Sequence, residues 1–190
     1  MPSLLTGAIA SGISGHLSSF ESIATVTVGS SPVSSISFSS IPSTYQHLQI
    51  RLVAKTNRST SPLSSAVFQF NSDTALNYFW HQVGGNGSSV FAGANPITDA
   101  INFDRTSGNS GATNIFGIGI IDILEYASLN KYKTIRALGG VNVNSAGEVE
   151  LQSGTWASTS AISSITIIPG TYQATQFLQY TQFALYGVKA

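Results

Sequence analysis

The sequence predicts an all-β protein: an antiparallel, jelly-roll-like β-sandwich with an extended N-terminal arm. Short segments in which apolar and polar residues alternate recur along the chain, and turns rich in Gly, Ser and Asn separate them. No segment has the spacing and caps of a long amphipathic helix. With 190 residues, the chain is long enough to bury a core as one domain of this kind.

The first 22 residues form the expected arm, and residues 23–190 form the sandwich. The arm is rich in Ser, Gly and Ala, and Gly7, Gly12 and Gly15 would each cost about 1 kcal/mol inside a helix. It lacks the basic start of a signal peptide. It is either a mobile terminus or a segment that becomes ordered on a neighbouring subunit. In the second case the partner-binding residues are Leu4, Leu5, Ile9, Ile13 and Leu17.

Ten strands are expected after the arm. Residues 45–55 show the pattern best, since Leu48, Ile50 and Leu52 alternate with polar neighbours. Residues 115–126 are the most apolar, and their β-branched and glycine content favours a buried strand over a helix. The expected strands span residues 24–28, 36–42, 45–55, 67–71, 78–83, 115–126, 132–138, 148–156, 162–168 and 177–188. Loops or turns are expected at residues 29–32, 57–65, 71–73, 84–89 and 142–147.

The composition excludes several classes of function. Charged residues make up 8% of the chain, against about 25% in an ordinary soluble domain. Eight basic and eight acidic residues cancel, which argues against nucleic-acid binding and against polybasic attachment to a membrane. The absence of cysteine excludes disulfides and thiolate metal sites. A charge-poor surface is weakly protected against association, so we expect much of it to be covered by partners.

The search for catalytic or metal-binding residues yields none that we assign, and no cofactor is expected. The histidines, His16, His47 and His81, lack the spacing of zinc ligands. Glu148 and Glu150 lie two apart on an expected strand, so both face the same side. That spacing suits glycosidase or Ca²⁺ chemistry, but it equally suits a solvated strand face. No serine lies in a GxSxG motif, and the glycine segments lack P-loop or Rossmann spacing.

Aromatic residues in the expected strands have two interpretations. They either pack in the core or, if several are exposed together, stack on sugars. Without positive charge around them, stacking on nucleic-acid bases is not expected. The residues concerned are Tyr45, Phe68, Phe70, Tyr78, Phe79, Trp80, Trp156, Tyr172, Tyr180 and Tyr186.

Four stretches together resemble a family of virion structural proteins of tailed phages, especially phages of cyanobacteria and marine bacteria. They read FSSIPSTYQHLQIRLVAKTNR at 38–58, FNSDTALNYFWHQVGGNGSSV at 70–90, and IIDILEYASLNKYKTIRALGG at 120–140. The fourth is SGTWASTSAISSITIIPG followed by FALYGVK, between residues 153 and 189. The family is similar to capsid decoration (cement) proteins, head fibres and tail-fibre domains.

The resemblance implies structural roles for several residues. Trp156 and Tyr45 are expected as core anchors. An internal or intersubunit ion-pair network is expected from Asp122, Glu125, Lys131, Lys133 and Arg136. The chain departs from the family at two positions: members often carry Asn-Gly-Asp where this chain has Asn71-Ser72-Asp73, and Asp in place of Glu125. These departures put in doubt any cation site at that turn.

Three functions are therefore considered. The first is a capsid decoration protein, not an enzyme: a homotrimer on the virion surface that binds the major capsid protein and stabilises the shell. The second is a tail-fibre or baseplate module that reads host glycans through loops at 57–65 or 84–95. The third is a polysaccharide-degrading enzyme that uses Glu148 and Glu150. We expect that deleting residues 1–20 leaves a folded body that no longer binds capsids.

Overall fold

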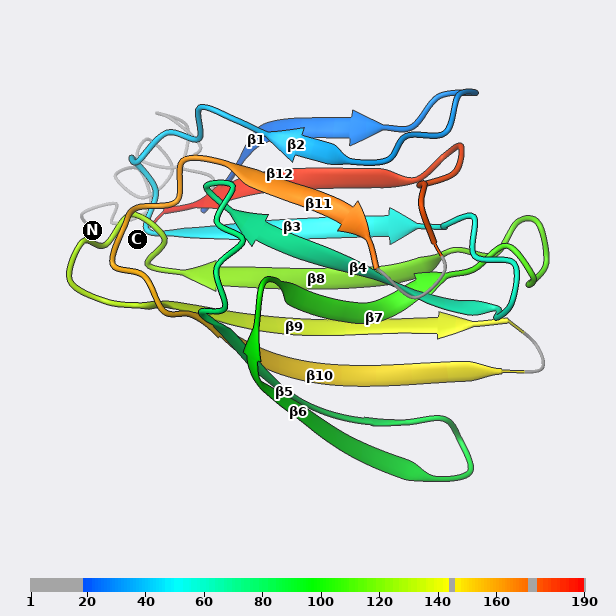
Figure 1. Ribbon diagram of the computed structural model, residues 1–190. Helices are drawn as coiled ribbons and strands as arrows, with labels where there is room; N and C mark the ends of the chain where they lie inside the picture. Colours follow the sequence, from blue (N-terminus) through cyan, green and yellow to red (C-terminus); the bar gives the residue numbers. More distant parts are fainter. Residues whose placement is uncertain (1–18, 144–145, 171–173, 190) are drawn as a thin grey trace, which may run out of the picture.

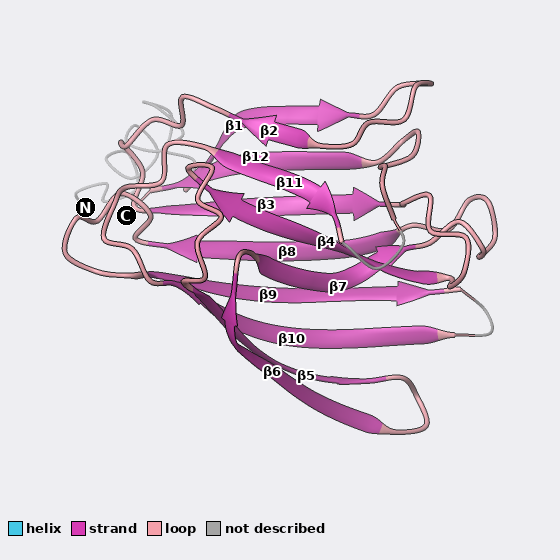
Figure 2. Ribbon diagram, in the orientation of Figure 1, coloured by secondary structure: helices cyan, strands magenta, loops and turns pink. Residues whose placement is uncertain are grey.

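The computed structural model describes residues 19–143, 146–170 and 174–189, and every regular element within these ranges is a β-strand (Figure 2). Twelve strands form two antiparallel sheets that face each other as a sandwich (Figure 1). The prediction of an antiparallel β-sandwich is confirmed, while the jelly-roll-like connectivity stays a prediction. Across these same ranges, no helix long and apolar enough to span a membrane is found.

The two sheets differ in size. The large sheet has the spatial order β1 (Phe20–Thr27), β12 (Gln182–Val188), β3 (His47–Ala54), β8 (Gly117–Leu124), β9 (Lys133–Asn142), β10 (Gly147–Trp156), β5 (Tyr78–Gly85) and β6 (Val90–Thr98). The small sheet has the order β2 (Ile36–Phe38), β11 (Ile165–Pro169), β4 (Leu63–Phe70) and β7 (Ile101–Ser107). Because the small sheet has half as many strands, it covers only part of the inner face of the large sheet.

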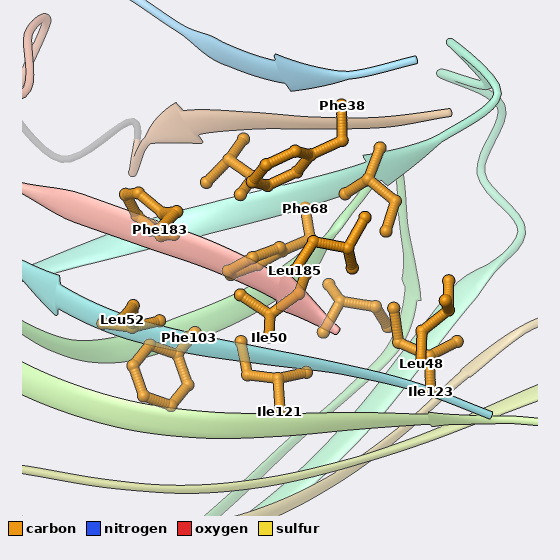
Figure 3. Close-up of a cluster of buried hydrophobic side chains, with 14 of the residues drawn as sticks. Phe38, Leu48, Ile50, Leu52, Phe68, Phe103, Ile121, Ile123, Phe183 and Leu185 are labelled. Atoms are coloured by element: carbon orange, nitrogen blue, oxygen red, sulfur yellow. The ribbon is translucent and has the colours of Figure 1, made fainter. Parts of the chain in front are cut away.

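The core lies between the sheets and follows the alternation in the sequence. Leu48, Ile50 and Leu52 of β3 are at most 3% exposed, and they belong to one buried cluster with Phe68 of β4 and Phe103 of β7 (Figure 3). Every second residue of β3 points inward, as the period of a strand requires. The inward set of β3 is therefore the one that the sequence predicts.

The two expected anchors occupy different depths. Trp156 is buried, its ring stacks on that of Tyr78 with centroids 6.3 Å apart, and it lies 5.7 Å from the ring of Phe70. Tyr45 is half-buried at the margin of the core. Its ring lies against the backbone of Gly187, where a Cβ atom would come within 2.3 Å of it. Tyr45 therefore closes the end of the sandwich next to β12.

Two strands were not expected from the sequence. β6 spans Val90–Thr98, so the expected glycan-reading loop at 84–95 is wrong: residues 84–85 end β5 and residues 90–95 lie in β6. Small residues and Pro96 hide the alternation in β6. β7 was missed because one of its inward positions is Arg105, which is buried although its side chain is charged.

Smaller differences concern the ends of elements. β1 begins at Phe20, so residues 20–22 belong to the sandwich and not to the arm. β4 begins at Leu63, which shortens the expected loop at 57–65. Lys55 follows β3 on its polar side but is buried, since its Nζ donates to the backbone oxygens of Ala112 and Thr113 at 2.8 and 3.1 Å. Burial lowers the pKa of Lys55.

Candidate functional site

The outer face of the large sheet is the candidate site, because the small sheet packs only on the other face. The alternation in β9 shows this division. Ile135 and Ala137 point inward and are 2% exposed, whereas Leu138 points outward and is 55% exposed. An outer sheet face in contact with water usually carries polar residues. Half of the outer face of the large sheet carries apolar residues instead.

Seven large apolar side chains, each 42–60% exposed, form what we call the apolar band on this face. They come from five strands of the large sheet: β3, β8, β9, β10 and β5. The members are Val53, Ile118, Ile120, Leu138, Val149, Leu151 and Val83. A contiguous apolar surface of this kind marks an interaction site more often than isolated exposed residues do.

The strand register makes the apolar band continuous. Ile120 lies opposite Leu138, Leu138 lies opposite Leu151, and Leu151 lies opposite Val83. Directly opposed residues have Cβ atoms about 4.5–5.5 Å apart, so these side chains touch one another across the sheet. The result is a row of side chains that crosses four strands at right angles to them.

Beside this row, glycines hollow the surface. Ile118 lies opposite Gly140, Gly140 lies opposite Val149, and Val149 lies opposite Gly85. An open hollow of about 710 Å³ is lined by these residues together with Phe116 and neighbouring polar residues. A ridge next to a hollow gives the apolar band relief into which side chains of another protein can insert.

The other half of the outer face is polar and internally bonded. Arg136 pairs with the carboxylate of Asp122 at 2.7 Å, and Gln49 Nε2 donates to the same carboxylate at 2.9 Å. Arg51 Nε donates to Gln49 Oε1 at 2.9 Å, and its guanidinium lies 5.2 Å from the ring centroid of Tyr186. Polar side chains engaged in this way keep this half of the face compatible with water.

The structure divides the five residues expected to form an ion-pair network. Asp122 pairs with Arg136, and Glu125 pairs separately with Lys131 at 2.6 Å. The hydrogen bond from Lys131 lowers the pKa of Glu125, but both side chains are exposed, so the pair adds little stability. Lys133 joins neither pair. It is buried, and its Nζ donates to backbone oxygens of Ser128, Lys131 and Ser158.

Glu148 and Glu150 face the same side of β10, as their spacing predicts, but that side points into the sandwich. Both carboxylates bind one guanidinium: Arg105 lies 2.8 Å from Glu148 Oε2 and 2.5 Å from Glu150 Oε2. The ring of Phe91 lies 5.1 Å from the same guanidinium. Arg105 comes from the small sheet, so this buried cluster joins the two layers. A buried charge of this kind needs such a partner.

The histidines are dispersed over the chain. His47 Nδ1 accepts a hydrogen bond from the backbone N–H of Glu125 at 2.9 Å, which holds the end of β8 against β3. His81 is exposed on the outer face, and His16 lies outside the described residues. In the part of the chain that the structure describes, no three His, Asp or Glu side chains gather as metal ligands would.

The aromatic residues divide between the core and the surface. Phe68, Phe70, Tyr78 and Trp156 are buried, which is the packing interpretation. Trp80 is half-buried, and Tyr180 is 68% exposed. The remaining members are Tyr45, Phe79 and Tyr186, which are half-buried, and Tyr172, which lies outside the described residues.

The expected partner-binding residues of the arm, Leu4 to Leu17, also lie outside the described residues.

The apolar band does not follow from the sequence, although all of its residues lie in expected strands. In β8 the outward Ile118 and Ile120 stand next to inward apolar residues, so the strand reads as one apolar run with no indication of which face is covered. The cross-strand register with β9 and β10, which are less apolar, shows which residues of β8 face outward.

Comparison with protein-family models, with curated proteins and with solved structures finds no match to this chain.

Proposed function

We propose that this protein is a structural component of a virus particle, a capsid decoration protein that acts through surface burial and carries out no reaction. The apolar band is the observation that carries the proposal. Seven half-exposed aliphatic side chains on one flat face are costly for a protein that stays alone in water. The resemblance to phage structural proteins supports the virus particle as the assembly to which the protein belongs.

The energy of this surface suits an assembly with many contacts. Covering the exposed part of one aliphatic side chain gains about 1 kcal/mol, so covering the whole band gains on the order of 7 kcal/mol. Association itself costs about 4–15 kcal/mol. One contact through the band is therefore weak on its own, whereas a closed trimer makes three such contacts at once and is held more firmly. Repetition of the contact over a symmetric shell converts weak contacts into firm attachment.

The proposed partners are further copies of the chain and the major capsid protein. Copies associate through the apolar band to form a homotrimer, and each trimer binds the shell of major capsid protein on the outer surface of the virion. The N-terminal arm contributes the contact to the shell. Clamping neighbouring capsomers in this way stabilises the shell against the pressure of the packaged genome.

The first experiment tests the band with the full chain. Leu138→Lys combined with Leu151→Lys places two charges in the centre of the band. We expect wild-type protein to form a trimer by size-exclusion chromatography with light scattering, and the double variant to be a monomer with unchanged circular dichroism. The matched control, Thr134→Lys with Ser153→Lys, lies on the same two strands in the polar half and should stay trimeric. A monomeric wild-type protein, or a trimeric band variant, would overturn the role of the band.

The second experiment tests whether the protein is a component of the virus particle. Quantitative mass spectrometry of purified virions that encode this chain measures its copy number per particle. We expect hundreds of copies, in a fixed ratio to the major capsid protein. A few copies per particle, or none, would contradict the decoration role whatever the band variants do.

A further inference from the structure

A second surface feature lies on the side of the large sheet opposite to the apolar band. There, β5 and β6 extend beyond β7, the last strand of the small sheet, so the inner face of the large sheet is left partly uncovered (Figure 1). A groove of about 130 Å³ lies at this step, lined by residues from both sheets. That volume is equivalent to about four water molecules.

Trp80 of β5 forms the aromatic wall of the groove. Trp80 lies opposite Gly154 of β10, and Leu151 and Ser153 of the same strand face outward. Because successive residues of a strand face opposite sides, Gly154 and Trp80 face the inner side. Unlike Trp156, Trp80 is only half-buried. Part of the Trp80 side chain is therefore open to a ligand beside the step.

The polar part of the lining consists of amides, one carboxylate and the hydroxyl of Thr98. Gln69, Asn95, Asp99 and Asn102 all line the groove, and they come from β4, β6, the turn after β6, and β7. Gln69 Nε2 donates to the backbone oxygen of Asp99 at 3.3 Å, and this bond does not use the Oε1 acceptor of Gln69. Asn95 Oδ1 accepts from the backbone N–H of Ile97 at 3.3 Å. Both donors and acceptors are thus held in place around the indole.

The backbone beside Trp80 is irregular in a way that shapes the groove. Tyr78 pairs with Thr98 but Trp80 pairs with Asn95, so β6 carries a bulge opposite β5. Bulges re-aim side chains and occur often beside binding sites. Here the bulge places Asn95 next to Trp80 and turns the chain toward Asp99 and β7.

We infer that this groove binds a single neutral sugar ring. The C–H bonds on one face of a pyranose carry partial positive charge and pack well on the negative face of an indole. The ring hydroxyls both donate and accept hydrogen bonds, as do the amides of Gln69 and Asn95. An apolar wall with a few convergent polar groups is the usual composition of a small-molecule site.

The charge of the lining selects among sugars. Asp99 is the only charged residue among those described as lining the groove, and it accepts but does not donate hydrogen bonds when ionised. It favours a hydroxyl-rich neutral ring and repels the carboxylate of an acidic sugar. The ligand class is therefore a neutral hexose or N-acetylhexosamine at the end of a surface glycan.

This inference is independent of the proposed function. The groove and the apolar band lie on opposite sides of the large sheet, so a variant in one leaves the other intact. A decoration protein with such a groove would add weak, repeated contacts to glycans around the particle. For a monosaccharide we expect a Kd on the order of 1 mM, given the few atoms that one ring can place in the groove.

The test is a fluorescence titration of the full chain with methyl glucoside, methyl galactoside, methyl mannoside, N-acetylglucosamine and N-acetylneuraminic acid. Trp156 is buried and its indole N–H is held by Asp73, so a saturable change reports on Trp80. We expect saturation with at least one neutral sugar and none with N-acetylneuraminic acid. Saturation-transfer NMR with the same sugars gives a second readout that does not depend on tryptophan.

Variants then assign the site by NMR. Trp80→Ala should abolish binding, and Trp80→Phe should retain it with a Kd raised at least about tenfold. Asn95→Ala should also weaken it, while Tyr180→Ala, which removes an exposed aromatic residue elsewhere, should leave it unchanged. Because Trp80→Phe preserves an aromatic wall, it separates loss of binding from loss of folding. No binding of any neutral sugar to the wild-type chain, or undiminished binding by a folded Trp80→Ala variant, would overturn the inference.

Discussion

At the residue scale, the turn between β4 and β5 holds distant parts of the chain together. Asn71 Oδ1 accepts from the backbone N–H groups of Ser163 and Ser164 at 2.8 and 3.1 Å, and its Nδ2 donates to Ala161. Asp73 accepts from the indole N–H of Trp156 at 2.8 Å. The two side chains thereby connect the turn both to the loop before β11 and to the end of β10.

The backbone of this turn favours glycine at position 72, where this chain has serine. Asn71 and Ser72 both have positive φ, 53° and 57°, and the N–H of Asp73 donates to the oxygen of Phe70 at 2.9 Å. Positive φ at both central residues together with this hydrogen bond is the pattern of a type I′ turn, which favours Asn-Gly. A serine in this conformation is strained, whereas glycine adopts it freely.

The first prediction follows from that strain. Ser72→Gly should raise the free energy of unfolding by about 0.5–1 kcal/mol, since the exposed Ser72 side chain makes no hydrogen bond to the described residues that would offset the strained backbone. Urea denaturation followed by tryptophan fluorescence measures the change. Asn71→Gly is the control, and it should destabilise because it removes the bonds to Ala161 and Ser163. A Ser72→Gly variant that is less stable than wild type would contradict this account of the turn.

The second prediction concerns acid. The hydrogen bond from Asn77, followed by those from the backbone of Ala75 and from Trp156, lowers the pKa of Asp73 below its ordinary value of 3.8. A carboxyl with a depressed pKa stabilises the fold above its unfolded pKa, and that contribution is lost as the pH falls through the folded pKa. Asp73→Asn should therefore be less stable than wild type by about 1 kcal/mol at neutral pH.

Thermal unfolding between neutral pH and strongly acidic pH tests this sign. The difference in Tm between wild type and Asp73→Asn should be constant above pH 5 or so and should shrink below the ordinary pKa of an aspartate. A difference that widens in acid would show that Asp73 does not stabilise the fold in its charged form.

Single residues also show what the sequence could and could not predict. The turn at Asn71 follows from composition, and the buried position of Trp156 agrees with the core-anchor role that the resemblance implies. The burial of Lys133 does not, because its Nζ is satisfied by three backbone oxygens that come together only in the folded loops. In place of the single ion-pair network that the resemblance implies, the structure therefore has two separate pairs and a buried lysine.

At the scale of elements, two glycines set how closely the sheets approach. Gly119 of β8 and Gly139 of β9 lie opposite each other, and a Cβ atom on either would come within 2.3 Å of Phe103 Cζ. The Phe103 ring of β7 thus rests directly on the backbone of the large sheet (Figure 3).

The third prediction tests that contact. Gly119→Ala should lower the free energy of unfolding by about 1–3 kcal/mol, because the added methyl group overpacks the core against Phe103. Phe103→Leu in the same chain should recover part of the loss, and a double-mutant cycle measures the coupling. Gly29→Ala is the matched control, since no atom lies within 4 Å of the added Cβ there. Equal losses in the two alanine variants would contradict the packing role.

Elements with a clean alternation were predictable, and those without it were not. β3 and β9 alternate between core and solvent, so their existence and their inward faces follow from the sequence. β6 and β7 carry small residues, a proline and a buried arginine, so no two-residue period of hydrophobicity marks them. The groove beside Trp80 depends on both of these strands, which is why sequence patterns alone did not locate it.

At the scale of the whole molecule, both the proposed function and the inferred sugar site depend on the unequal size of the two sheets. The large sheet exposes an apolar band on its outer face and leaves Trp80 accessible at the step on its inner face. Neither feature follows from composition, although the low charge of the chain does predict a surface that favours association. The face that each residue occupies is decided by cross-strand register, which long-range pairing sets.

The place of β12 has a consequence for biosynthesis. β12 leaves the ribosome after β1 to β11, yet it lies between β1 and β3 in the interior of the large sheet. Until β12 emerges, β3 has an unpaired edge and β1 has no neighbour to hold it, so the sheet closes only after β12 is made. Such late closure exposes open strand edges to other nascent chains. High-level expression of this protein should therefore benefit from slow synthesis at low temperature.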